Sequence, residues 1–146
     1  MYYNPFKAMD NKQLAGFREC DHTADGEIEV WAESLEELFA YSAKGMYALG
    51  GVELSPEPRS TQELQFSAVD DEALLVNFLG ELIYLWEQHH LAFDCFEFEL
   101  KDQNLKVKAE GAPIKTAARQ IKAITYHRLK IECRGGIYYT HLVFDL

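Results

Sequence analysis

Mostly apolar residues recur at helical spacing in a stretch of the sequence that begins near residue 34. Ser34 and Glu37 have the spacing of a capping box, in which the hydroxyl accepts from the N3 amide and the carboxylate binds back to the cap. Gly50-Gly51 ends the stretch, because glycine accepts the left-handed backbone that follows a helix. The pattern predicts a helix over residues 34–49, with one face formed by Leu35, Leu38, Phe39, Ser42, Met46 and Leu49.

A second and broader apolar stripe follows residue 70. Asp70 or Asp71 can cap its first turn, where Asp71 and Glu72 also lie near the positive end of the helix dipole. His89-His90 follows the stripe, where histidines interact with exposed carbonyl groups at the negative end. The width of the stripe predicts a well-buried helix, whose apolar residues are Leu74, Leu75, Phe78, Leu79, Leu82, Ile83, Leu85 and Trp86.

The remaining segments show the alternation of β-strands. Ile28, Val30 and Ala32 alternate with glutamates, and shorter strands fit residues 17–20 and 64–68. Two hairpins are indicated later in the chain, and their predicted strands are 96–100 with 105–109 and 121–133 with 137–146. Locally paired strands together with two main helices predict an α+β fold of antiparallel β-sheets in a single compact domain.

The net charge of the chain limits the classes of partner that it is expected to bind. Its 146 residues include 14 Lys and Arg against 24 Asp and Glu, which gives a formal net charge of −10 at pH 7. Proteins that bind nucleic acids by themselves usually concentrate basic residues, so this chain would on average be repelled. An acidic surface suits cations or basic protein surfaces as partners, although it can also serve solubility alone.

The cysteines and the N-terminus indicate a compartment. Cys20, Cys95 and Cys133 are odd in number and widely spaced, which is typical of reduced thiols rather than of a disulfide framework. The first residues lack the apolar run of a signal peptide. No segment approaches the ~20 apolar residues that cross a bilayer. We therefore expect a soluble, cytoplasmic protein with no membrane partner.

The densest group of candidate functional residues is the segment 21–25. Asp21, His22 and Asp25 bring two carboxylates and an imidazole together beside a strand, and Gly26 follows at a tight turn. Carboxylate oxygens suit hard cations such as Ca²⁺, Mg²⁺ or Mn²⁺. The alternative is an ordinary turn in which Asp25 binds local backbone amides, and the spacing alone favours it.

The C-terminus is a second candidate. If the last strand is ordered to its end, Asp145, the Leu146 carbonyl and the terminal carboxylate offer several oxygen ligands in one place. An edge strand with a solvated end is the alternative, since chain termini are commonly frayed.

Lys122, in the segment 121–126, is the third candidate. In a strand it would share one face with Ile124 and Tyr126. Near a cluster of carboxylates, its ammonium group could contact phosphate or hold a carboxylate in place. A solvent-facing strand lysine is the alternative.

Motifs of self-sufficient enzymes are scarce in this sequence. Cys20 and His22 have the spacing of half a zinc site, but no second Cys/His pair with such spacing accompanies them. Gly50-Gly51 is not followed by the GK[ST] of a phosphate-binding loop, and no G-x-S-x-G elbow occurs.

Taken together, these segments resemble the archease family. The matching pieces are the Asp21–Asp25 motif DHTAD, the segment 31–39, the segment 122–127 (KAITYH) and the ending Phe144-Asp145-Leu146. Gly26-Glu27 departs from the Val-Gly-type continuation usual in the family. The resemblance implies an archease domain over residues 17–146, preceded by an N-terminal extension, residues 1–16.

The resemblance also implies functional residues. A divalent metal site, of the kind described with calcium and with Mn²⁺ or Mg²⁺ as alternatives, would be built from Asp25, Asp145 and an oxygen of Leu146. The family's important lysine corresponds to Lys122. The functional positions of the first motif correspond to Asp21 and His22.

The resemblance implies an accessory protein rather than an enzyme. Its expected partner is an RtcB-type RNA ligase, which uses GTP and Mn²⁺ in tRNA splicing or RNA repair. The accessory protein would promote guanylylation and multiple turnover of the ligase, and it would meet RNA only through that enzyme.

Two other functions are compatible with the same residues. One is a metal-dependent phosphoesterase that uses Asp21, His22, Asp25 and Asp145 to activate water. The other is a cation-binding, chaperone-like interaction module. Phosphate release by the isolated protein would favour the first, and loss of soluble clients on deletion would favour the second.

Overall fold

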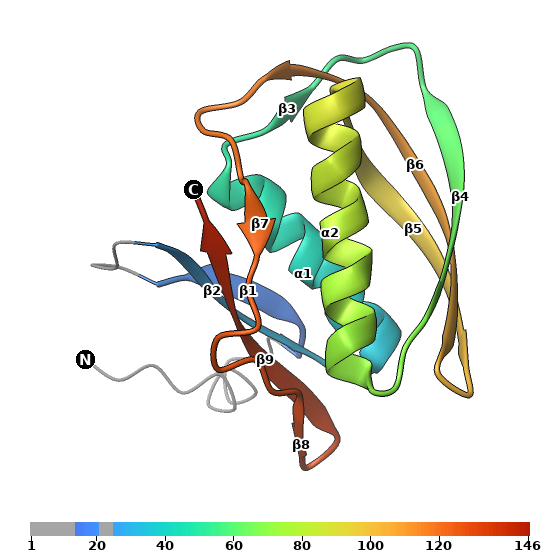
Figure 1. Cartoon of the computed structure of the whole chain (residues 1–146), viewed down its shortest axis with the longest axis vertical. Helices are drawn as coiled ribbons and strands as arrows, with labels where there is room; N and C mark the ends of the chain where they lie inside the picture. The colour runs from blue at the N-terminus through green and yellow to red at the C-terminus, as the bar shows by residue number, and fades with distance from the viewer. Residues whose placement is uncertain (1–13, 21–24) are drawn as a thin grey trace.

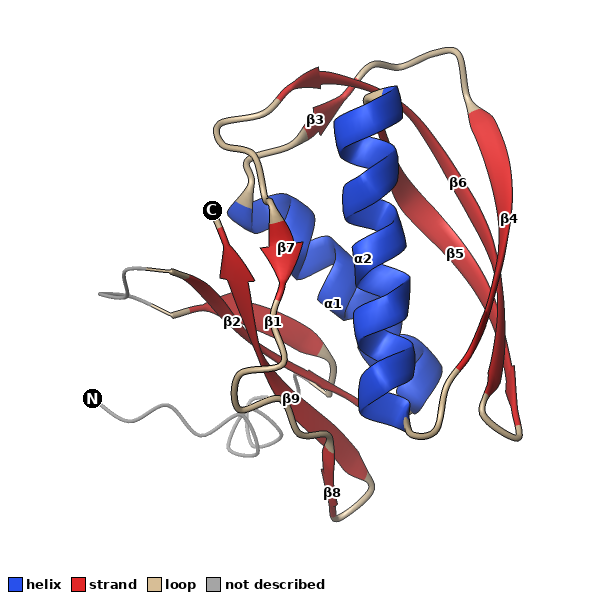
Figure 2. Ribbon diagram, viewed as in Figure 1, coloured by secondary structure: helices blue, strands red, loops and turns tan. Residues whose placement is uncertain are grey.

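Two antiparallel sheets enclose two helices in the computed structural model, which describes residues 14–20 and 25–146 (Figures 1 and 2). One sheet lies on either side of the helix pair, so each helix packs against strands of both sheets. The predicted α+β class, with two main helices in one domain, is confirmed. None of the helices in the described ranges is long and apolar enough to cross a membrane.

The first sheet has five strands and contains both the beginning and the end of the described chain. Its order is β1-β2-β9-β7, and β8 pairs with β9 beside β7. The central pairing of β2 with β9 runs from Gly26 opposite Phe144 to Ala32 opposite Tyr138. The strands are β1 (Gly16–Glu19), β2 (Gly26–Ala32), β7 (Ala123–Ile124), β8 (Glu132–Arg134) and β9 (Ile137–Asp145).

The second sheet has four strands arranged around the long β6. β6 pairs with β5 along one edge and with β3 and β4 along the other. Asp102 and Gln103 both have positive φ, at 52° and 62°, as the tight turn of the predicted hairpin between β5 and β6 requires. The strands are β3 (Glu53–Leu54), β4 (Ser60–Ser67), β5 (Leu91–Lys101) and β6 (Asn104–Thr116).

The first helix, α1 (Leu35–Leu49), follows the predicted signals closely. The Ser34 hydroxyl accepts from the Glu37 amide over 3.1 Å. The Glu37 carboxylate accepts from the amide of Glu33 over 3.0 Å, one residue before the cap. At the other end, Gly51 takes the left-handed conformation with φ at 62°.

The second helix, α2 (Asp71–His89), begins at the predicted aspartates. Asp70 is the N-cap, and its carboxylate accepts from the amide of Ala73 over 2.8 Å. The helix ends at His90, which has left-handed backbone dihedrals. His89 lies within the last turn, and its imidazole is near the negative end of the helix as expected.

A cluster of phenylalanines joins both helices to the second sheet. Phe78 of α2 is fully buried, and its ring centroid lies 6.0 Å from Phe39 of α1. The same ring lies 5.7 Å from Phe96 and 5.5 Å from Phe98, both on β5, in edge-on contacts. Edge-on aromatic pairs add about 0.5–1.5 kcal/mol each beyond the burial of their area. This cluster therefore fixes the helices on the second sheet.

The prediction of one continuous strand over residues 121–133 is wrong. The segment is divided into β7 and β8 by a loop, in which Arg128 has φ at 57° and the Leu129 amide donates to the Tyr126 carbonyl over 3.1 Å. The Thr140 hydroxyl donates to the carbonyl of Lys130 over 3.0 Å and replaces a ladder bond there. Alternation of residue types does not reveal a positive-φ turn at an arginine, so the strand was extended too far. The two-residue β3 also escaped prediction.

Two glycine substitutions test how tightly the second sheet is packed. In Gly111→Ala, the new Cβ meets the Ala92 carbonyl and lies 2.7 Å from the Cα of Phe93. We expect the free energy of unfolding to fall by about 1–3 kcal/mol, because backbone cannot move aside as a flexible side chain can. Chemical denaturation measures the change. Gly80→Ala in α2 is the control: nothing lies within 4 Å of its Cβ, and better helix propensity should raise stability by up to about 1 kcal/mol.

Candidate functional site

The first metal candidates lie where β2 begins and β9 ends. Because the two strands are antiparallel, the start of one lies beside the end of the other. Gly26 opposite Phe144 is the outermost pair of their ladder. Asp25 precedes this pair and Asp145 follows it, and both side chains are exposed. The fold thus brings two aspartates from opposite ends of the sequence to neighbouring positions at one end of the β2–β9 ladder.

Leu146 is held at the same place by packing. Its side chain is half-buried against the core, and a Cβ added at Gly26 would lie 3.2 Å from Cδ2 of Leu146. The same Cβ would lie 2.6 Å from Cδ2 of Leu49, in the last turn of α1. Glycine at position 26 therefore leaves the space in which the two leucines sit. Because Leu146 is the next residue after Asp145, its backbone oxygens lie beside that aspartate.

Lys122 lies on the other side of β9. Its amide donates to the Asp145 carbonyl over 2.8 Å, next to the pairing of Ala123 with Asp145. Lys122 immediately precedes β7, is exposed, and lines a groove beside α2 together with Ala123 and Ile124. Within the described part of the chain, no carboxylate forms an ion pair with the Lys122 ammonium group. The backbone of Lys122 is therefore next to Asp145, and its ammonium group is not paired with a carboxylate of the described residues.

Lys122 lines a groove between α2 and β7. Its volume is about 550 Å³. Val76, Gly80 and Ile83 of α2 supply much of its wall, and Glu81 adds a negative charge. The sequence contained one signal for this groove: a glycine in the interior of a helix costs about 1 kcal/mol relative to alanine, and Gly80 is such a residue. The lining residues are Phe66, Val76, Asn77, Gly80, Glu81, Ile83, Lys122, Ala123 and Ile124.

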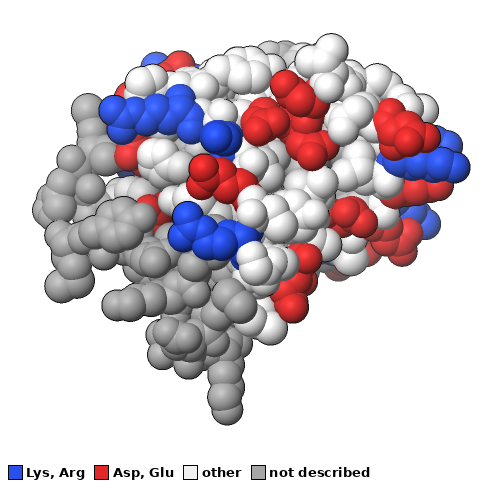
Figure 3. Space-filling view, turned by 90° about the horizontal axis from the view of Figure 1, so that it is seen from below, with Lys and Arg blue, Asp and Glu red and all other residues white. Residues whose placement is uncertain are grey.

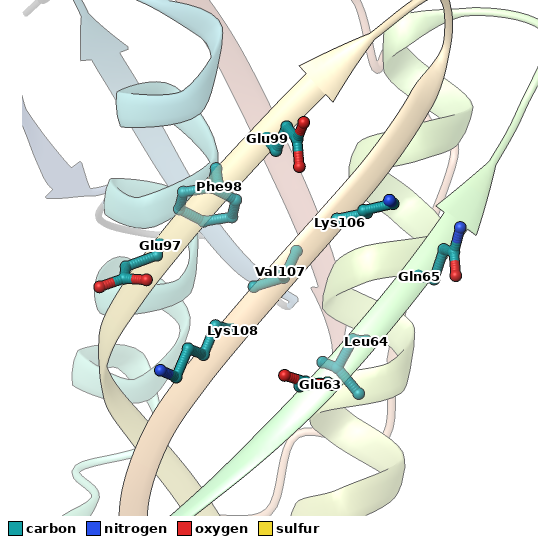
Figure 4. Close-up of a pocket in the computed structure, with 9 residues that line it drawn as sticks. All are labelled: Glu63, Leu64, Gln65, Glu97, Phe98, Glu99, Lys106, Val107 and Lys108. Atoms are coloured by element: carbon teal, nitrogen blue, oxygen red, sulfur yellow. The ribbon is translucent and has the colours of Figure 1, made fainter.

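A second hollow, of about 570 Å³, covers the outer face of the second sheet (Figure 4). Glu97 and Glu99 of β5 stand opposite Lys108 and Lys106 of β6, and Glu63 of β4 stands opposite Lys108 from the other side. Cross-strand pairs of opposite charge stabilise a sheet by about 0.2–1 kcal/mol each. The two lysines offset two of the three glutamate charges of this hollow, and strand pairing explains their arrangement.

Acidic side chains also gather away from the strand ends. Both helices begin at the lower end of the molecule in Figure 1, and their first turns carry Glu36, Glu37, Asp71 and Glu72. Figure 3 views this end from below and shows several groups of acidic side chains, with some Lys and Arg side chains directly beside them. Acidic groups in a first turn are favoured by the helix dipole. Acidic side chains therefore occur in too many places to identify a site by themselves. The meeting of the ends of β2 and β9 does identify one.

The structure describes four of the six predicted site residues. Asp21 and His22 lie outside the described residues, as do residues 1–13 of the predicted N-terminal extension. Asp25, Lys122, Asp145 and Leu146 are all described, and they lie around the end of β9.

Comparison with known proteins identifies the family. A model of the Archease protein family (MTH1598/TM1083) matches residues 17–146. The chain belongs to the archease family.

Relatives in the archease family match nearly the whole chain. The archease of Methanopyrus kandleri is 30% identical over 138 residues, which cover 89% of this chain and 99% of that protein. The archease of Pyrococcus abyssi is 34% identical over 135 residues, with 86% and 95% covered. The predicted resemblance is thereby confirmed.

Solved archease structures share the fold. The crystal structure of an archease from Thermotoga maritima, described as a possible chaperone, is 27% identical with a TM-score of 0.65, covering 88% of this chain and 96% of that one. The solution structure of Methanobacterium thermoautotrophicum protein 1598 has a TM-score of 0.66 at 24% identity, with 90% and 99% covered.

The packing of Leu146 over Gly26 can be tested directly in this archease. In Gly26→Ala, the added methyl group must displace Leu49 or Leu146, so we expect a loss of about 1–3 kcal/mol in the free energy of unfolding. We also expect the methyl resonances of Leu146 to shift in NMR spectra. Unchanged stability together with unchanged Leu146 resonances would contradict this packing, and Gly80→Ala again serves as the control.

Proposed function

We propose that this protein is an accessory factor, not itself an enzyme, that activates an RtcB-type RNA ligase in the cytoplasm. The ligase uses GTP and Mn²⁺ in tRNA splicing or RNA repair. The accessory protein promotes its guanylylation and its multiple turnover. Membership of the archease family supports the proposal in general. The convergence of Asp25 with Asp145 is the single observation in this chain that carries it.

The donor set at this point fits a hard divalent cation, calcium in the first instance and Mn²⁺ or Mg²⁺ otherwise. Asp25 and Asp145 supply carboxylate oxygens, and Leu146 adds a backbone or terminal oxygen. Calcium takes 6–8 oxygen ligands, so these residues would leave several positions for water or for groups of a partner. A bound cation there would supply positive charge to phosphate oxygens.

The charge of the molecule supports a protein partner over a nucleic acid. With a net charge of −10, the chain is on average repelled by phosphate backbones and attracted to basic surfaces. A ligase active site that binds RNA and GTP must itself present basic groups and metal ions. The exposed carboxylates at the end of β9 are suited to meet such an opening, and contact with RNA would then pass through the ligase.

Lys122 has a second role in this proposal. Its amide donates to the Asp145 carbonyl, and the residue also lines the groove at α2. A lysine ammonium group is a compact positive charge that binds phosphate or carboxylate groups of a partner. The carboxylates and Lys122 would thus contact the ligase from two sides of one strand end.

The carboxylates are tested by removing their charge without changing their shape. We expect Asp25→Asn and Asp145→Asn each to fold normally and to weaken calcium binding by about 10-fold to 100-fold or more. They should also lose stimulation of ligase guanylylation and of multiple-turnover RNA joining. Calorimetric calcium titration and assays with the purified ligase measure the two effects.

Asp102→Asn provides the matched control, because it makes the same change in a distant hairpin turn whose left-handed backbone suits asparagine. It should retain both calcium binding and stimulation. Full stimulation by the two strand-end variants would contradict the proposal. Phosphate release from model esters without ligase would support the phosphoesterase instead. Protection of heated ligase from aggregation, without an effect on guanylylation, would support a chaperone-like module.

Lys122→Gln separates the lysine from the metal site. Because Lys122 is not one of the proposed metal ligands, we expect calcium affinity to stay within about twofold of the unmodified protein, while ligase stimulation falls by about 10-fold or more. The same titration and turnover assays apply. Lys101→Gln, at the tip of β5, is the matched control and should stimulate fully. Equal behaviour of the two lysine variants would exclude a specific role for Lys122.

A further inference from the structure

A cysteine, a glutamate and a histidine meet on the first sheet. Cys20 follows β1, Glu27 lies in β2 and His141 lies in β9, and their ligand atoms are all within 4.8 Å of one another. Within residues 14–20 and 25–146, no other three Cys, His, Asp or Glu side chains converge in this way. All three residues are half-buried. We refer to them as the Cys-Glu-His cluster.

The backbone of the sheet positions this cluster. The Cys20 amide donates to the Glu27 carbonyl over 2.8 Å, which extends the ladder of β1 and β2 by one pair. Glu27 stands opposite Val143 in β9, so His141 is its diagonal neighbour on the same face. The inward faces of these strands carry Ile28 and other core residues. The cluster therefore lies on the face of the sheet that is turned away from the helices, and adjacent strands rather than loops set its distances.

The distance between the ligand atoms of Glu27 and His141 fits two ligands of a shared ion. Nε2 of His141 and Oε2 of Glu27 are 3.4 Å apart, and their side chains are 25% and 23% exposed. Zinc bonds of about 2.0–2.3 Å at tetrahedral angles hold neighbouring ligand atoms about 3.3–3.6 Å apart. Glu27 and His141 alone would be an ordinary polar pair between neighbouring strands. The Cys20 sulfur lies within 4.8 Å of the ligand atoms of both Glu27 and His141. The group therefore offers a sulfur ligand in addition to nitrogen and oxygen.

We propose that Cys20, Glu27 and His141 bind one divalent transition-metal ion, for which Zn²⁺ is the best match. Thiolate and imidazole ligands favour such borderline ions, whereas Ca²⁺ and Mg²⁺ favour oxygen ligands throughout. Three protein ligands leave one position of a tetrahedral ion for water or another donor. This site shares no ligand with the proposed site of Asp25, Asp145 and Leu146 at the end of β9, and it does not depend on ligase activation.

A bound ion would connect three strands of the first sheet. Its ligands come from the end of β1, the start of β2 and the middle of β9, which lie side by side in Figure 1. An ion that binds only the folded protein stabilises it in proportion to the logarithm of its concentration over its dissociation constant. Zinc should therefore raise the melting temperature of the protein.

Cobalt titration tests the site, because Co²⁺ replaces Zn²⁺ and reports its ligands by absorption. Protein stripped with a chelator should bind one equivalent of Co²⁺, with a thiolate-to-metal charge-transfer band and the d–d bands of tetrahedral cobalt, and Zn²⁺ should abolish both. Cys20→Ser should lose the charge-transfer band. His141→Gln should weaken zinc binding by about 10-fold or more in calorimetric titration.

Two control variants assign the effect to this cluster. Cys133→Ser removes an exposed thiol of β8 and should keep the charge-transfer band. Asp145→Asn should keep it as well, which distinguishes this site from the proposed calcium site. The proposal is overturned if no band forms at one equivalent, if the band survives in Cys20→Ser, or if it disappears in Cys133→Ser. Should Cys20→Ser fail to fold, unchanged zinc affinity in both Glu27→Gln and His141→Gln overturns it.

Discussion

The pairing of β2 with β9 is the constraint on which the rest of this structure depends. It joins an early strand to the last one, so a long stretch of chain must be closed before the ladder forms, although the entropic cost rises only slowly with loop length. Burial opposes that cost, because Ile28, Val30, Leu142 and Phe144 along the ladder are completely buried. β1 attaches to one side of this pair, and β7 and β8 attach to the other. The helices then cover its inward face.

The same ladder creates two chemically different places. At its end, where the core stops, Asp25 and Asp145 can be exposed and close together without a desolvation penalty. Further along, on the face turned away from the helices, Cys20, Glu27 and His141 converge under partial burial. Oxygen ligands in water suit a hard cation, and mixed sulfur, nitrogen and oxygen ligands suit a softer one. The pairing of β2 with β9, to which the end of β1 adds Cys20, thus accounts for both proposed metal sites.

Local signals in the sequence were reliable where short-range interactions decide the structure. The serine cap at Ser34, the aspartate cap at Asp70 and the turn at residues 102–103 all follow from contacts within a few positions. Prediction failed over residues 121–133, where the edge of β9 is shared between β7 and β8 and a left-handed arginine reverses the chain between them. The position of that break depends on which β9 residues each part of the segment can pair with. Alternation within residues 121–133 does not show this.

The sequence by itself determined the two helices, most strands, the acidic charge and the family, because these rest on local periodicity, composition and linear motifs. The resemblance to the archease family also implied that Asp25, Asp145 and an oxygen of Leu146 form one metal site, with Lys122 as a further functional residue. Only the tertiary structure decided how these positions meet: antiparallel pairing places Asp25 beside the end of β9, where the Lys122 amide binds the Asp145 carbonyl, and Lys122 also lines the groove at α2. The tertiary structure alone brought His141 to Cys20 and Glu27. The physical reason is that strand register, set by burial of a shared core, fixes distances between residues far apart in the chain.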